Sequence, residues 1–119
     1  MSFSTHAAAS QCDNDRRALR RQAEDELALA IGSYSGRKAD AGSTQLYAFA
    51  RPIASYVAHG LLSECEVRAR FLDAARDKGD IERYGAPWAV VTVRSAFVAA
   101  NGDPPPRLRP EYRQEDAHA

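Results

Sequence analysis

The stretch "RPIASYVAHGLLSECEVRARFLDAA" (residues 51–75) contains two apolar-striped segments on either side of "HGLLS". This join is either the turn of a DNA-reading helix-turn-helix or an ordinary corner in a helical bundle. A helix-turn-helix keeps a small residue about four positions before the turn glycine and an apolar residue about six positions after it. Measured from Gly60, those positions hold Tyr56 and Glu66, and neither fits. We therefore interpret the stretch as a helix, a corner and a second helix of the core.

The second half of the stretch carries a strong signal for the start of a helix. Ser63 and Glu66 have the spacing of a capping box, and Leu62 and Val67 that of a hydrophobic staple. The apolar stripe continues up to Gly79 through Val67, Phe71, Ala74 and Ala75. The outward residues of this helix mix carboxylates with arginines, which would set acids against phosphates if the helix lay on DNA.

The first half predicts a helix that begins at Ser43 or Thr44 and stops at Gly60. Its inward residues are Leu46, Phe49, Ala50, Ile53 and Val57. Pro52 lies inside it and removes a backbone hydrogen bond, at a cost of about 3 kcal/mol unless the helix kinks or restarts. The sequence therefore predicts either a kink near residues 48–51 or two shorter helices.

An earlier helix is expected to start at Asp13 or Asp15 and to end near Ser33. Its apolar residues recur at spacings of three and four: Leu19, Ala23, Leu27, Ala30, Ile31 and Tyr34. The following "GSYSGRKADAGST" (residues 32–44) is expected to form a loop, with "SYSGRK" as a weak candidate for an anion-binding nest.

The last segment, "YGAPWAVVTVRSAFVAANGD" (residues 84–103), is ambiguous because "AVVTV" is typical of a buried strand. Pro87 in a first turn, the length of the segment and the lack of a second strand favour a helix. Its apolar residues point in several directions, which predicts a helix packed in the middle of the others.

These elements predict an all-α protein, a compact bundle of four to five helices. The helical domain covers residues 13–102, with a flexible tail at residues 1–12 and a proline-rich flexible tail at residues 103–119. A chain of 119 residues fits a single domain.

Composition excludes several classes of function. No apolar run is long enough to cross a bilayer, and the N-terminal charges follow the apolar residues, the reverse of a secretory signal, so we expect a cytoplasmic protein. The 16 basic residues balance the 16 acidic ones, so nucleic acid would be bound only by a local patch. Cys12 and Cys65 have no ligand at metal spacing and are expected to be free thiols.

Two short elements resemble the small helical domain of phage and plasmid primase-helicase replication proteins, those of the primase-polymerase type. The corner at Val57, Ala58 and residues 60–62 is similar to the "V-A-A-G-L-L" corner of that family, and residues 92–97 are similar to its closing "T-I-R-S-G-L" element. The similarity spans roughly residues 40–102. The family's Arg-Asn pair and later Asn are replaced by Gly42, Ser43 and Tyr47, and no phosphate loop or paired-acid metal site is present. The resemblance implies a detached helical module.

No constellation of catalytic residues is found, and we expect no enzymatic activity, cofactor, metal or small-molecule substrate. His59 is expected to cap carbonyls at a helix end. Arg94 lies in an apolar run and must snorkel, pair with a carboxylate or face a ligand, with the ion pair favoured over a phosphate contact. The residues expected to bind nucleic acid are Arg16, Arg17, Arg20 and Arg21, with Arg37, Lys38 and Arg94 as secondary candidates.

Two hypotheses for function follow. The first is an accessory module from a mobile genetic element that binds DNA weakly and without specificity, or that docks on a replication protein such as a primase or helicase. The alternative is a small phage- or plasmid-encoded protein that binds and inhibits or regulates a host protein such as a nuclease complex, in the manner of an anti-CRISPR protein. A mixed, arginine-rich surface suits a protein interface about as well as a nucleic-acid interface.

Overall fold

The structure is a computed structural model that describes the backbone of residues 2–37 and 44–113 and the side chains of residues 12–37 and 44–113. Within these residues all regular structure is helical, as the sequence predicts. The elements are α1 (Ser2–Gly36), α2 (Thr44–Ala58), α3 (Glu64–Lys78), α4 (Asp80–Tyr84), α5 (Ala86–Ala99) and the 3₁₀ turn η2 (Ala100–Gly102).

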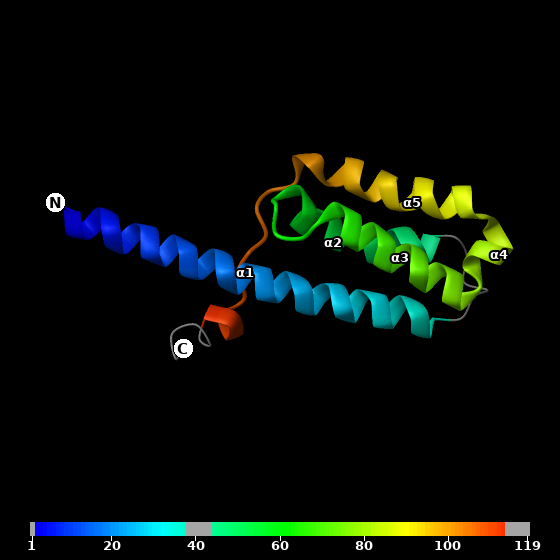
Figure 1. The fold of residues 1–119 in the computed structure, drawn as a ribbon, viewed down its shortest axis with the longest axis horizontal. Coiled ribbons are helices and arrows are strands. Elements are labelled where there is room, and N and C mark those ends of the chain that lie inside the picture. The colour runs from blue at the N-terminus through cyan, green and yellow to red at the C-terminus, as the bar shows by residue number, and fades with distance from the viewer. Residues whose placement is uncertain (1, 38–43, 114–119) are drawn as a thin grey trace.

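The helices form a bundle around α2, which packs against α1, α3 and α5. Figure 1 shows α1 and α5 on opposite sides, with α2 and α3 between them, and the N-terminal half of α1 extending beyond the other helices. The largest fully buried side chains include Tyr34, Leu46, Ile53, Phe71 and Val93. Each long helix thus contributes to one apolar core.

Helix α1 is longer than expected at both ends. It begins at Ser2 rather than at Asp13 or Asp15, and the alanine run at residues 7–9 provides strong helix formers there. It continues to Gly36, so the predicted loop at residues 32–44 is wrong for its first five residues, 32–36. Tyr34 is completely buried, and this tertiary contact outweighs the low helix propensity of the glycines beside it.

Helix α2 is a single helix with Pro52 inside it, so the prediction of two shorter helices is wrong. Pro52 and Ala48 are both exposed, and the carbonyl that loses its partner can therefore bond to water. At the end of α2, Gly60 has φ +73° and the amide of Leu61 donates to the carbonyl of Tyr56 over 2.9 Å. This is the Schellman arrangement, and it confirms Gly60 as the helix stop.

Helix α3 confirms its predicted signals. The Ser63 side chain accepts a hydrogen bond from the amide of Glu66, and Gly79 ends the helix in the left-handed region with φ 91°. Val67 is buried in the main core, and the half-buried Leu62 packs against it.

Helix α5 confirms the choice of helix over strand, with Pro87 in its first turn. Its predicted place in the middle of the bundle is wrong, because Val91 and Val98 are 57% and 63% exposed. The central position belongs to α2, whose neighbours cover it on three sides. The short α4, which the sequence pattern does not resolve, connects α3 to α5.

Candidate functional site

Residues 103–113, which we call the strap, cross α1 instead of extending away from the bundle. In Figure 1 the strap leaves the end of α5 and passes across the middle of α1. The side chain of Gln22, which is 2% exposed, holds it by donating to the Arg107 carbonyl over 2.9 Å and accepting from the Arg109 amide over 2.8 Å. Gln22 also donates to the hydroxyl of Tyr56, so one buried amide joins α1, α2 and the strap.

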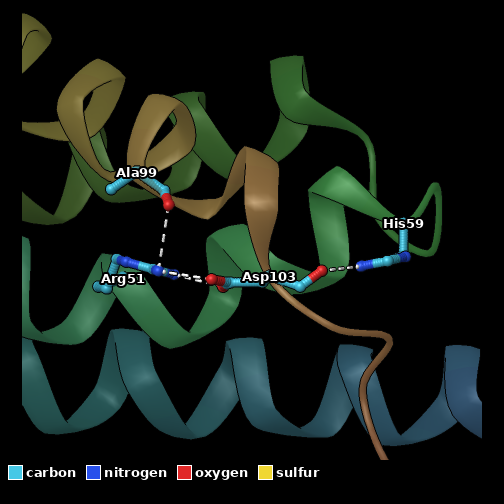
Figure 2. A network of polar contacts seen from close by, with 4 residues as sticks. All are labelled: Arg51, His59, Ala99 and Asp103. Atoms are coloured by element: carbon cyan, nitrogen blue, oxygen red, sulfur yellow. Dashed lines mark hydrogen bonds and ion pairs between the residues drawn. The ribbon is translucent and has the colours of Figure 1, made fainter.

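The start of the strap is fixed by a second network, drawn in Figure 2. Arg51 donates two hydrogen bonds to the carboxylate of Asp103, over 2.6 and 2.7 Å, and a third to the carbonyl of Ala99. The bonded guanidinium lowers the pKa of Asp103. His59 Nε2 donates to the backbone carbonyl of Asp103 over 2.9 Å. His59 therefore bonds to a carbonyl, as expected, but to one from the strap and not to one at the end of α2.

The last described turn of the strap lies on α1. Tyr112 donates to the carboxylate of Asp25 over 2.6 Å, and this hydrogen bond raises the pKa of Tyr112 to about 12. The guanidinium of Arg21 reaches the backbone carbonyl of Tyr112, and Arg109 pairs with Glu26. Two acids of α1 are thereby bound by strap side chains. These contacts involve the first part of the tail that the sequence predicts to be flexible, whereas residues 114–119 lie outside the described part of the chain.

The primary arginine candidates lie on α1 around this crossing. Arg16, Arg17 and Arg20 line one shallow hollow together with Asp13. Arg16 also donates to the carbonyl of Gly60, while Arg17 and Arg20 are exposed and form no bond to the residues that the structure describes. Arg21 lies at the contact with Tyr112. The structure thus brings three of the four into one hollow and places the fourth beside the strap.

The strap adds two exposed arginines that the sequence pattern did not single out. Arg107 follows the three prolines, and its backbone carbonyl is bound by Gln22. Arg113 comes directly after Tyr112, whose carbonyl is bound by Arg21. We call the set formed by Arg16, Arg17, Arg20, Arg21, Arg107 and Arg113 the arginine surface. The four arginines of α1 and the two of the strap lie about ninety positions apart in the chain, and the contacts at Gln22 and Arg21 bring the two segments to one crossing.

The secondary candidates do not join this surface. Arg37 follows the far end of α1, where its guanidinium lies 5.5 Å from the ring centre of Phe49. Arg94 is exposed on α5, across the bundle from α1, and forms no ion pair with any described residue, so the favoured ion pair is not found there. Lys38 lies outside the described residues. The proposed nest at "SYSGRK" is wrong over residues 33–36, which are helical.

A buried polar cluster at the other end of α1 was also missed. Tyr34 donates to Asp80 over 2.6 Å, and Lys78 lies 3.8 Å from the same carboxylate oxygen and 4.1 Å from the centre of the Tyr34 ring. Burial, followed by the bond to Asp80, raises the pKa of Tyr34. The side chains of Lys78 and Asp80 are each 4% exposed, and Lys78 also donates to Gln45. The only signal in the sequence was "DKGD" (residues 77–80), in which a glycine ends one helix and the acid after it begins the next.

We interpret this cluster as a structural contact that joins α1, α3 and α4, and not as a reactive site. The ammonium of Lys78 would compete with any cation, and the side chains of the cluster are closed off from solvent. In the described part of the chain no group of three or more His, Cys, Asp or Glu residues is arranged to hold a metal ion. Among the same residues, no helix has both the length and the apolar character to span a bilayer.

Comparison of this chain with protein-family models, with curated proteins and with solved structures gives no significant match. The resemblance to the primase-helicase domain therefore stays a prediction.

Proposed function

We propose that this chain is a non-enzymatic accessory module that binds DNA weakly, through phosphate contacts and without preference for sequence. The observation that carries the proposal is the strap crossing, in which Gln22 of α1 donates to the carbonyl of Arg107 and Arg21 donates to the carbonyl of Tyr112, next to Arg113. Guanidinium groups match phosphate oxygens in geometry and stay charged at any physiological pH. At the same crossing Arg109 pairs with Glu26, which compensates one negative charge and reduces local repulsion of phosphate.

The absence of a recognition helix makes the binding independent of sequence. The first turn of α3, which follows the corner, carries Glu64 and Glu66 and would meet phosphates with like charge. Net charge is zero, so no long-range field adds to the contacts of the surface itself. Weak, strongly salt-dependent affinity is therefore expected.

The resemblance to the helical domain of primase-helicase proteins supports a narrower form of this proposal. In that form the module belongs to a mobile genetic element and acts beside a replication protein, with the arginine surface holding the DNA on which that protein works.

Fluorescence anisotropy with a labelled duplex, at low and at moderate salt, tests the proposal. The variant is Arg17→Ala with Arg20→Ala, because both side chains are exposed and neither supports the fold by a bond to a described residue. The matched control is Arg70→Ala with Arg83→Ala, which removes the same charge from exposed positions on α3 and α4. The test variant should weaken binding equally for all duplex sequences. It should also reduce the salt slope by about 0.9 for each phosphate that is no longer neutralised, while the control retains the slope.

Equal weakening in both variants would mean that total charge, and not the arginine surface, governs binding. Undetectable binding at low salt would contradict the proposal and favour the alternative, a protein that binds and regulates a host protein such as a nuclease complex.

A further inference from the structure

The outer face of α5 combines apolar side chains with one charged side chain, and none of the residues that the structure describes covers it. We define this face by Val91, Arg94, Ser95 and Val98, which follow one another at the i, i+3, i+4 and i+7 positions of a helix. Val91 is 57% exposed and Val98 is 63% exposed, although both belong to the residue types that are most often buried. They stand two turns apart, about 10.5 Å along the helix axis.

A shallow hollow adjoins the C-terminal half of this face. It lies between the start of α3 and the end of α5, and it is lined by Glu64, Arg68, Arg94, Phe97, Val98 and Asn101. Arg68 donates to Glu64 over 2.6 Å, so the single carboxylate of the hollow is already paired. Arg94 is left as its uncompensated positive charge. The hollow therefore complements a carboxylate.

From this arrangement we propose that the outer face of α5 docks an acidic amphipathic helix of a partner protein. Two apolar residues of that helix, seven positions apart, cover Val91 and Val98, and a Glu or Asp between them pairs with Arg94. This is the way helices are recognised through apolar anchors at i, i+3, i+4 and i+7. The site is separate from the arginine surface, since α1 and α5 lie on opposite sides of the bundle (Figure 1).

Charge argues against a second copy of this chain as the occupant. Two copies related by a twofold axis would place their Arg94 side chains close together near the centre of the contact, whether the two α5 helices run parallel or antiparallel. Like charges at the centre of a contact disfavour it. A phosphate backbone is also a poor match, because it would leave both valines exposed beside a single arginine.

The test titrates the ¹⁵N-labelled full chain with a synthetic helical peptide of about 14 residues, four turns. The peptide has leucines seven positions apart with glutamates between them, and a matched peptide carries lysines in place of the glutamates. Amide shifts should cluster on α5 and at Glu64 and Arg68, and the lysine peptide should bind at least tenfold more weakly. Val91→Ser with Val98→Ser should weaken binding of the acidic peptide at least tenfold. Leu29→Ser, at a similarly exposed leucine on α1, should leave it unchanged.

Charge reversal provides the decisive arm. Arg94→Glu should lose the acidic peptide and gain the lysine peptide, with the helical circular dichroism spectrum unchanged. The proposal is overturned if both peptides bind the original chain equally, if the shifts fall outside α5 and its hollow, or if no shifts occur at millimolar peptide. Dimerisation through α5, or shifts on α5 with duplex DNA, would overturn it as well. Arg17→Ala with Arg20→Ala should leave peptide binding intact, so failure of the DNA proposal can be told from failure of this one.

Discussion

Tyr34 on α1 donates a 2.6 Å hydrogen bond to Asp80, the first residue of α4, and both side chains are buried. The second carboxylate oxygen of Asp80 has no hydrogen-bond partner among the described residues. The tyrosine hydroxyl and the ammonium of Lys78 therefore carry most of the compensation for a buried negative charge.

Removal of the Tyr34 hydroxyl should be costly. Tyr34→Phe leaves the Asp80 carboxylate without its shortest hydrogen bond, and we expect the free energy of unfolding to fall by about 1–3 kcal/mol. Urea unfolding followed by circular dichroism measures the change. Tyr84→Phe is the control, because Tyr84 is half-buried and packs its ring on Trp88, and it should change stability by less than about 0.5 kcal/mol. Equal effects of the two substitutions would contradict the assigned role.

Alkaline pH should act through the same hydroxyl. The pKa of Tyr34 is raised in the folded state, so the folded chain holds this proton more tightly than the unfolded chain does. The stability that this provides is complete below the unfolded pKa of about 10 and is lost as pH rises from there towards the folded pKa. Between pH 10 and 11 this loss should be about 1 kcal/mol for Tyr34, because the unfolded tyrosine is already half ionised at pH 10. In Tyr34→Phe the free energy of unfolding should decrease less over this interval. An equal decrease in the variant would mean that other tyrosines cause it.

The corner glycine should be intolerant of a side chain. Gly60 has φ +73°, and a Cβ there would lie 3.3 Å from a guanidinium nitrogen of Arg16. Gly60→Ala should therefore destabilise the fold by about 1–2 kcal/mol. Gly32→Ala is the matched comparison, since Gly32 lies inside α1 with no atom near the added Cβ, and it should stabilise by about 0.5–1 kcal/mol. Thermal unfolding of both variants measures the difference, and a change of the same sign in both would show that the conformation of Gly60 is not special.

Detachment of the strap should expose its arginines to protease. Asp103→Asn removes the charge that Arg51 binds, and Gln22→Leu removes the hydrogen bonds to residues 107 and 109. Each should increase the rate of trypsin cleavage between Arg107 and Leu108 while the helical content is retained; the bond after Arg109 precedes Pro110 and is not a trypsin site. Cleavage after Arg37, beside the far end of α1, is the internal reference.

Acid should have the same effect on the strap. The pKa of Asp103 is lowered by the Arg51 bond, so its contribution is complete above the ordinary pKa of about 4 and is lost as pH falls through the lower folded value. Hydrogen exchange of the Arg109 amide, which donates to Gln22, should therefore become faster below pH 4 relative to core amides. A constant ratio would contradict this coupling.

The sequence predicted well those features that depend on neighbouring residues. The capping box at Ser63, the stop at Gly60 and the buried stripes of α1, α2 and α3 are all found, because each depends on spacing within one or two turns. The outer placement of α5 could not be predicted. The sequence shows that many residues of α5 are apolar, but it does not show which of them a neighbouring helix covers.

The candidate site was only half predictable for a related reason. The arginines of α1 form a visible run, but the prolines and alternating charges of residues 103–113 are typical of a disordered tail. Gln22, a polar residue inside a helix, gave no sign that it would be buried and hold two backbone groups of residues 107 and 109. Contacts between such distant segments leave no local pattern in one sequence.

The position of the strap also sets the time at which the arginine surface can exist. Residues 103–113 are synthesised after all five α-helices, and Gln22 must wait for partners that are 85 and 87 positions away. Because a contact between such distant positions closes a long loop, at a larger cost in chain entropy than a turn within one helix, we expect the strap to join a bundle that has already formed. The arginine surface would therefore be the last part of the molecule to assemble, after the core that supports it.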